Sequence, residues 1–202
     1  MPAIAATTLS LQSFIVPVHD SAHGYLPYVN PAAPKGGVIR LKAADVTYTT
    51  FNPYGIVDVP AAGIGRTFAS LMVAALDDPL TVYPYLATQF DWTGTTMRVD
   101  LQEKAQFHDG TPLTGEDVQA TFQALQQSDL SLHQQSLHTL ERVEVPSPHT
   151  VRFIFKEKPS HETVFFLMQL PILSHFDLKE GRLPTGDSPL RSSGPYYVAD
   201  YR

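Results

Sequence analysis

The stretch FHDGTPLTGEDV, residues Phe107–Val118, decides how this sequence folds, because it places a tight turn directly before the start of a helix. Asp109-Gly110 is a turn dipeptide whose carboxylate can accept a hydrogen bond from a following backbone N–H. Thr114 is a good N-cap residue, and Asp117, three positions later, completes a capping box. The stretch therefore predicts a helix with one apolar face, formed by Val118, Phe122 and Leu125.

Alternating side chains on both sides of this stretch predict antiparallel strands. Residues 97–101 alternate apolar with charged or polar side chains, and a tight turn at 93–94 leads back from them to residues 89–92, which predicts a first hairpin. Residues 143–155 alternate on either side of the Pro-rich break at 146–149, which predicts a β-hairpin. Three further elements are expected after the hairpin: a short helix over 161–170, a loop over 178–191 and a last strand entered at 194–198.

The first part of the chain has a less regular pattern. Residues 1–37 are expected to be irregular and turn-rich, whereas 38–46 alternates as a strand. After a break at 52–55, apolar residues recur at spacings of four, three and four, which predicts one face of a helix: Ile64, Phe68, Leu71 and Ala75. Strands and helices mix without regular β-α alternation, so the predicted class is α/β or α+β with a mixed sheet.

Composition excludes several classes of protein. The 202 residues are 43% hydrophobic, which is enough for a core, and 17 prolines against 12 glycines predict stiff connections. The absence of cysteine removes disulfides, thiolate catalysis and Cys-based zinc sites. A net charge of −6 without a basic stripe argues against a nucleic-acid partner. Without a run of about 18 apolar residues, no direct membrane insertion is expected. Residues 1–18 lack the Lys or Arg of an export signal and are interpreted as an eroded signal or an expression start.

No group of residues predicts a catalytic site, a metal or a cofactor. His19 and His23 lie among prolines and a glycine that oppose a helix, and His133 and His138 do not share a helical face. His108-Asp109 is better explained as part of a turn than as a catalytic dyad. Two further fragments lack the rest of their motifs: Ser192-Ser193-Gly194 has no nucleophile elbow, and Gly63-Ile64-Gly65 has no third glycine.

Aromatic residues gather beside glycines and prolines at the ends of the expected elements. Core packing and the lining of a ligand cleft explain them equally well, because a tyrosine offers apolar area with a polar tip. The residues concerned are Tyr25, Tyr28, Tyr48, Phe51, Tyr54, Tyr83, Tyr85, Tyr196 and Tyr197.

A set of collinear motifs runs from about residue 23 to the end of the chain. YVNPAAPKGGVIRL at 28–41 enters the first strand, TFNPY at 50–54 forms the turn after it, and AGIG at 62–65 fits the helix that follows. FHDGTPLTGEDV, HTVRF at 149–153 and SGPY at 193–196 follow in order. Together they resemble the family 5 extracellular solute-binding proteins, and more narrowly the Yej-type oligopeptide-binding branch.

The resemblance implies an α/β fold: a mixed-sheet periplasmic-binding-protein-like (type II) lobe with an inserted α+β subdomain, truncated relative to the family. Residues 38–46 and 170–202 would belong to the first, hinge-side domain, and 47–169 to the inserted second domain. The implied function is a periplasmic, extracytoplasmic binding protein of an ABC importer, not an enzyme. Its partners would be an oligopeptide ligand and the membrane permease.

Carried onto matching positions, the resemblance places five residues in the cleft after the first strand: Tyr48, Thr49, Thr50, Phe51 and Asn52. Main-chain hydrogen bonds would hold the peptide backbone there, although a simple strand-to-turn connection would also explain these residues. Because family members continue well beyond SGPY, we expect weak or no peptide binding by the 202-residue chain alone. Two alternatives stay open: a stand-alone interaction lobe, which predicts an exposed apolar face and dimerisation, and a metal-dependent hydrolase, which predicts a bound metal.

Overall fold

The predicted helix cap is formed at the start of α1 (Gly115–Gln127) in the computed structural model of the chain. Thr114 Oγ1 accepts a hydrogen bond from Glu116 N, and Asp117 Oδ2 accepts one from Thr114 N at 2.8 Å, which confirms the capping box. The structure describes residues 9–10, 26, 28–34, 36, 38, 40, 47–54, 58–128, 136–181 and 188–201.

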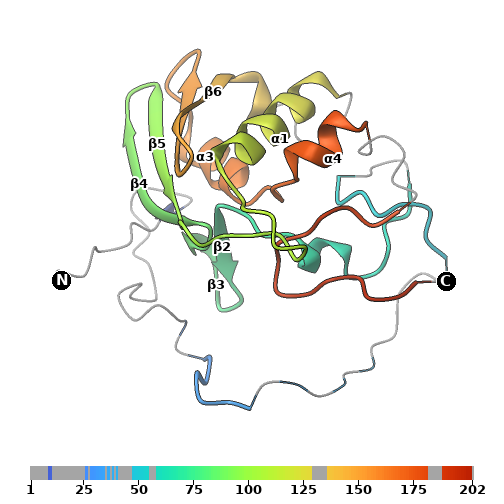
Figure 1. Cartoon of the computed structure of the whole chain (residues 1–202). Coiled ribbons are helices and arrows are strands. Elements are labelled where there is room, and N and C mark those ends of the chain that lie inside the picture. Colours follow the sequence, from blue (N-terminus) through green and yellow to red (C-terminus); the bar gives the residue numbers. More distant parts are fainter. Residues whose placement is uncertain are drawn as a thin grey trace.

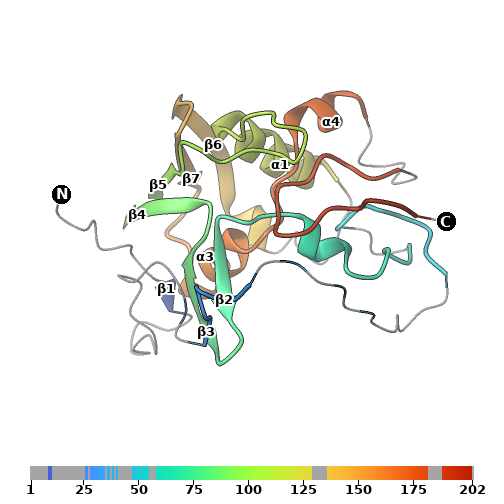
Figure 2. The same cartoon turned by 60° about the horizontal axis from the view of Figure 1, so that its bottom comes forward.

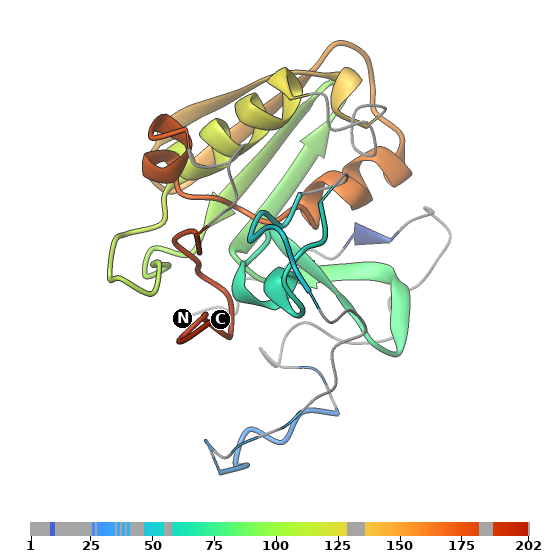
Figure 3. The ribbon, with the colours of Figure 1, turned by 90° about the vertical axis from the view of Figure 1, so that its right-hand side faces the viewer.

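Helix α1 packs on a four-stranded antiparallel sheet. Its strands, in order across the sheet, are β4 (Ala87–Thr93), β5 (Thr96–Leu101), β7 (Thr150–Phe155) and β6 (Leu140–Ser147). Figure 3 shows the helix lying across one face of this sheet. Phe122 of α1 meets Phe153 of β7 edge to face, with ring centroids 5.0 Å apart, and both rings are fully buried. Pairing of β4 with β5 and of β6 with β7 confirms both predicted hairpins.

A smaller sheet has the order β1 (Leu9–Ser10), β3 (Asp78–Pro84) and β2 (Met72–Ala75). Figures 1 and 2 show the β2–β3 hairpin projecting from the end of the larger sheet. Strand β1 pairs with β3, so the expectation that residues 1–37 are irregular is wrong for residues 9 and 10. The turn-rich stretch that follows is confirmed at Asn30, whose Oδ1 accepts a hydrogen bond from Ala32 N at 3.0 Å. Apart from residues 38 and 40, the predicted strand 38–46 lies outside the described residues.

The helix predicted over Ile64–Ala75 is wrong. The chain forms a short 3-10 helix, Ile64–Thr67, and then extends into β2. The four apolar residues of the pattern are all buried, but they reach the core from the 3-10 helix, from the connection after it and from β2 instead of from one helix. Pairing with β3 decides the outcome, since Val73 lies opposite Tyr83 and Ala74 opposite Val82. Glycines at 63 and 65 also weaken any helix there.

The remaining elements are α3 (His161–Met168), which confirms the predicted short helix, and α4 (His175–Lys179), which extends into the expected loop. The predicted last strand at 194–198 is wrong, because these residues have no regular secondary structure. Pro195 removes one backbone donor from that segment. Within the described parts of the chain, no helix is long and apolar enough to cross a membrane.

Candidate functional site

The segment Tyr48–Asn52 is extended and is held along one edge by the chain that returns at 58–61. Thr50 pairs with Pro60 in a parallel bridge. The amides of Thr49 and Thr50 both donate to Val59 O, at 2.9 and 3.3 Å, and Ala61 N donates to Thr50 O at 2.9 Å. One edge of the segment is therefore occupied by the protein's own backbone.

The side chains of the segment divide into two groups. Thr50, Phe51 and Asn52 are buried, whereas Tyr48 is half-buried and Thr49 exposed. Thr50 Oγ1 accepts a hydrogen bond from Asn52 N at 3.0 Å, and Asn52 Oδ1 accepts one from Tyr54 N at 2.8 Å. These two polar side chains shape the turn that ends the segment, as Asx and Ser/Thr turns do. Tyr48 and Thr49 are the two candidates with surface to offer to a ligand.

The second edge of the segment is open within the described part of the chain. There, the C=O of Thr49 and the N–H and C=O of Phe51 have no hydrogen-bond partner among the described residues. Phe51 as a whole is nevertheless buried. Buried backbone groups are almost always paired, so these three groups are candidates for hydrogen bonds to water or to the backbone of a ligand.

Aromatic rings surround Phe51. Its ring centroid lies 5.1 Å from that of Tyr48 and 4.8 Å from that of Tyr201, both edge to face. On the same C-terminal segment as Tyr201, Tyr196 and Tyr197 are strongly exposed, at 59% and 67%, and the ring of Tyr197 lies against that of His108. Among the other aromatic candidates, Tyr54 belongs to the core: burial raises the pKa of its phenol, which donates to Pro171 O at 2.5 Å. Tyr25 lies outside the described residues.

The C-terminal segment reaches this position because Gly194 lies against the 3-10 helix. Gly194 N donates to Thr67 O at 2.7 Å, and a Cβ on Gly194 would lie 2.6 Å from Thr67 C and 2.7 Å from Phe68 N. Ser193 Oγ accepts a hydrogen bond from Ala69 N at 3.3 Å. The glycine of the SGPY motif is thus required for the close approach of two backbones.

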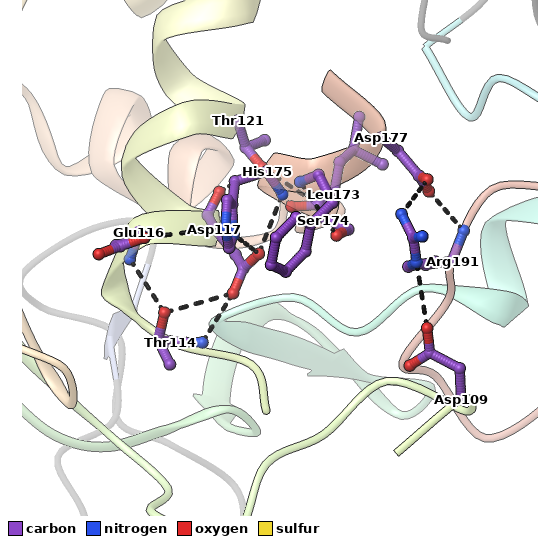
Figure 4. A network of polar contacts seen from close by, with 11 residues as sticks. Asp109, Thr114, Glu116, Asp117, Thr121, Leu173, Ser174, His175, Asp177 and Arg191 are labelled. Atoms are coloured by element: carbon purple, nitrogen blue, oxygen red, sulfur yellow. Dashed lines mark hydrogen bonds and ion pairs between the residues drawn. The ribbon is translucent and has the colours of Figure 1, made fainter. Parts of the chain in front are cut away.

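A polar network ties the FHDGTPLTGEDV stretch to the segment that returns after α3 (Figure 4). The fully buried carboxylate of Asp117 accepts hydrogen bonds from His175 N at 3.0 Å and from His175 Nδ1 at 2.8 Å. The buried Asp177 accepts bonds from Arg191 N and Nη1 at 2.6 and 2.7 Å, while Arg191 Nε donates to Asp109 at 3.1 Å. Bonds from the Thr111 amide and hydroxyl, followed by Arg191, lower the pKa of Asp109.

The histidine of this stretch has a structural role. His108 Nε2 donates to Gly194 O at 2.8 Å, which leaves Nδ1 to accept the Ser192 hydroxyl at 3.2 Å. Asp109 bonds to Thr111 N and Arg191, so it does not orient the imidazole as a catalytic carboxylate would. Among the described residues no three His, Asp or Glu side chains gather as a metal site, and His19, His23 and His133 lie outside them.

A hollow of about 810 Å³ beside α3 was not predicted from the sequence. It begins where the candidate segment ends, at Pro53 and Tyr54, and is bounded by α3 and by the chain up to Pro171. The five consecutive apolar residues 164–168 were a signal in the sequence, since successive helical positions turn around the axis and not all five can face one core. Phe165 is buried and Phe166 is 50% exposed at the hollow.

Comparison with known proteins identifies the class to which this fold and this segment belong. Residues 81–202 match the profile of the bacterial extracellular solute-binding proteins, family 5 middle region. The YejA protein of Escherichia coli K12 is 33% identical over 182 residues, covering 88% of this chain and 30% of the relative. A probable peptide-binding protein, YejA of Agrobacterium fabrum, is 29% identical over 194 residues, covering 90% and 31%.

Solved structures show the same fold. A periplasmic oligopeptide-binding protein of an ABC transporter from Thermotoga maritima gives a TM-score of 0.64 at 24% identity, covering 76% of this chain and 30% of that one. The mannohexaose complex of that protein gives 0.63 at 25% identity, covering 76% and 29%. The architecture is therefore that of a periplasmic-binding-protein-like lobe.

The chain belongs to the bacterial extracellular solute-binding proteins of family 5, which are binding proteins and not enzymes. It spans about 30% of the length of the curated relatives it matches and corresponds to their N-terminal portion.

Proposed function

We propose that the chain acts in an extracytoplasmic, periplasmic substrate-binding component of an ABC importer, and that Tyr48–Asn52 binds the backbone of an oligopeptide in a cleft between lobes. The Thermotoga maritima protein is described as a periplasmic oligopeptide-binding protein of an ABC transporter, and the Agrobacterium fabrum relative as a probable peptide-binding protein. The permease of the importer is the proposed membrane partner.

The open edge of the candidate segment carries this proposal. The free N–H and C=O of Phe51 and the C=O of Thr49, each without a partner among the described residues, offer one donor and two acceptors in a row. An extended peptide that adds as a strand would pair with all three groups and leave its side chains in pockets beside them. Backbone pairing of this kind tolerates many side chains, because each residue of the ligand supplies the same N–H and C=O.

Binding in a cleft between lobes requires that the chain contribute to more than one domain. We assign residues 38–46 and 170–202 to the hinge-side domain and 47–169 to the inserted second domain. The larger sheet, the β2–β3 hairpin, α1 and α3 all fall within 72–168, and Pro171 forms a bridge with Ser70 where the chain returns. In this division the candidate segment lies close to the hinge between the two domains.

Titration with backbone-modified peptides tests the proposal. The 202-residue chain, labelled with ¹⁵N, is titrated with trialanine and with the same peptide N-methylated at its central amide. We expect saturable amide shifts at 49–52 at millimolar trialanine, and much weaker shifts with the methylated peptide, because it has lost a backbone donor. Shifts of equal size with both peptides, or saturable shifts elsewhere with none at 49–52, would remove the segment from the site.

The exposed tyrosines favour a second candidate function, an interaction lobe that binds another polypeptide without binding peptide. Tyr196, Tyr197 and Tyr201 present large aromatic area on one short segment. Burying this area in a protein interface would be favourable. Native mass spectrometry separates the two functions: concentration-dependent dimers that take up no trialanine support the interaction lobe, whereas peptide on a monomer supports the binding component.

A further inference from the structure

The hollow beside α3 has the dimensions of a ligand subsite. Its volume of about 810 Å³ lies within the range of small-molecule pockets, about 300–1,000 Å³. Pro53 and Tyr54 line it, so it is continuous with the end of the candidate segment Tyr48–Asn52. A peptide lying along that segment would therefore extend one residue's side chain toward the hollow.

One wall of the hollow is apolar and unfilled. Phe166 projects from α3 with 50% of its surface exposed, while Phe165, 5.6 Å away between ring centroids, is buried in the core. Leu167 and Leu170 form the floor around these rings and are buried. An aliphatic or aromatic group placed over Phe166 would remove apolar surface from water, which is favourable in proportion to the area covered.

Apart from Ser136 and Glu162, the polar side chains of the described wall are bonded within the protein. Ser160 Oγ caps α3 by accepting from Thr163 N at 3.0 Å, and Gln169 Nε2 donates to Phe165 O at 3.0 Å. Glu162 is the one charged side chain among the described lining residues, and it makes no ion pair with any other described residue. Glu162 lies in the first turn of α3, where the helix dipole stabilises its negative charge. This interaction leaves the carboxylate oxygens available to a ligand.

We propose that this hollow is a specificity subsite for a Lys or Arg side chain of the peptide ligand, an assignment that rests on the proposed peptide-binding function. The aliphatic stem lies over Phe166, and the cationic head pairs with Glu162. Lys and Arg are suited to such a site because they bury their stems along apolar surface and keep the charge at its rim. An Arg head also gains from an aromatic face nearby. The net charge of −6 favours the approach of a cationic peptide.

Matched tripeptides test the subsite: Ala-Lys-Ala, and Ala-norleucine-Ala, which keeps the stem without the charge. We expect the wild-type chain to bind the lysine peptide about 2- to 5-fold more tightly, the gain of one partly exposed ion pair. Glu162→Gln abolishes the difference and leaves norleucine affinity unchanged. Phe166→Ala weakens the binding of both peptides. Glu103→Gln, which removes an exposed carboxylate outside the hollow, changes neither.

The outcomes separate this proposal from the function on which it rests. Equal affinity for the two peptides, or a lysine preference that survives Glu162→Gln, overturns the subsite while leaving peptide binding intact. If neither peptide binds, the hollow is tested directly with N-acetyl-lysine N-methylamide. Saturable amide shifts over 160–169 that Glu162→Gln abolishes support the subsite without the peptide mechanism. The absence of such shifts at millimolar probe overturns it.

Discussion

The sheet with α1 and the two flanking segments, 47–54 and 188–201, are held in place by different forces. Apolar side chains hold the sheet and α1, which bury Phe122, Phe153 and their neighbours completely. The flanking segments have no regular secondary structure beyond one isolated bridge; they contribute single core residues such as Phe51, Tyr54 and Leu190 and are otherwise tied by bonds such as Gly194 N to Thr67 O. The sheet and α1 thus form the stable base, while the candidate site is built on segments without a regular hydrogen-bonded ladder. We therefore expect substitutions in the sheet and α1 to change the stability of the whole fold, and substitutions in the flanking segments to change only their surroundings.

The largest effect is expected at the center of the first region. Phe122→Ala removes a fully buried ring that meets Phe153 edge to face, and should lower the free energy of unfolding by about 3–5 kcal/mol. Urea denaturation followed by circular dichroism measures it. Leu76→Ala is the control, since Leu76 is 92% exposed, and should change stability by less than about 0.5 kcal/mol. A small loss at Phe122 would mean that the sheet and helix do not form one cooperative core.

The second prediction concerns the buried carboxylate of Asp117, which joins the start of α1 to the start of α4. Asp117→Ala leaves the amides of Thr114 and His175 without their acceptor and should destabilise the protein by about 2–3 kcal/mol. Glu116→Ala, in the same turn but with an exposed side chain, should have a much smaller effect. Urea denaturation of both variants provides the comparison, and equal losses would show that the carboxylate bonds contribute little.

The third prediction confines its effect to the flanking segment. Gly194→Ala places a Cβ against the backbone of Thr67 and Phe68 and should cost about 1–3 kcal/mol. Hydrogen exchange should show lost protection of the amide at 194 with unchanged protection in β5 and β7. Gly65→Ala is the matched control, because its Cβ would meet nothing within 4 Å. Loss of protection in the sheet as well would show that the two regions unfold as one cooperative unit.

The smallest effect is a pH dependence. Because the pKa of Asp109 is lower in the folded chain than its usual value, its ionised form stabilises the fold above the unfolded pKa of about 4. That contribution is lost as the pH falls through the lowered folded pKa. The effect is small because the carboxylate is 43% exposed and screened by solvent. Asp109→Asn should flatten the fall in stability between about pH 5 and 3; a slope identical to that of the wild type would contradict this assignment.

Local sequence patterns predicted most of the secondary structure of the sheet and α1. They failed where pairing between distant segments determines the secondary structure. The capping box at Thr114 and the two hairpins were predicted because their signals lie within a few residues of the contacts they describe. The helix over Ile64–Ala75 was wrong because its apolar spacing suits a helix, while pairing with β3 requires a strand. Tertiary pairing overrides local propensity in this way when it buries the same side chains.

The candidate site shows the same limit. The motifs indicated the position of Tyr48–Asn52, but not that Thr50 and Asn52 would turn inward to shape a turn. They gave no sign that Tyr201 would lie against Phe51, 150 positions earlier in the chain. Nor could they predict the hollow, which needs Pro53, α3 and Pro171 together.

The sequence by itself indicated the family through its collinear motifs, and it determined the antiparallel hairpins and the capped helix because residue order carries turn chemistry and periodicity directly. The tertiary structure alone decided which backbone edge stays open, which phenylalanine of the α3 pair faces outward, and that Glu162 lies at the rim of an apolar hollow. The physical reason is that exposure and pairing depend on the packing of segments far apart in the chain, and no local pattern contains that information.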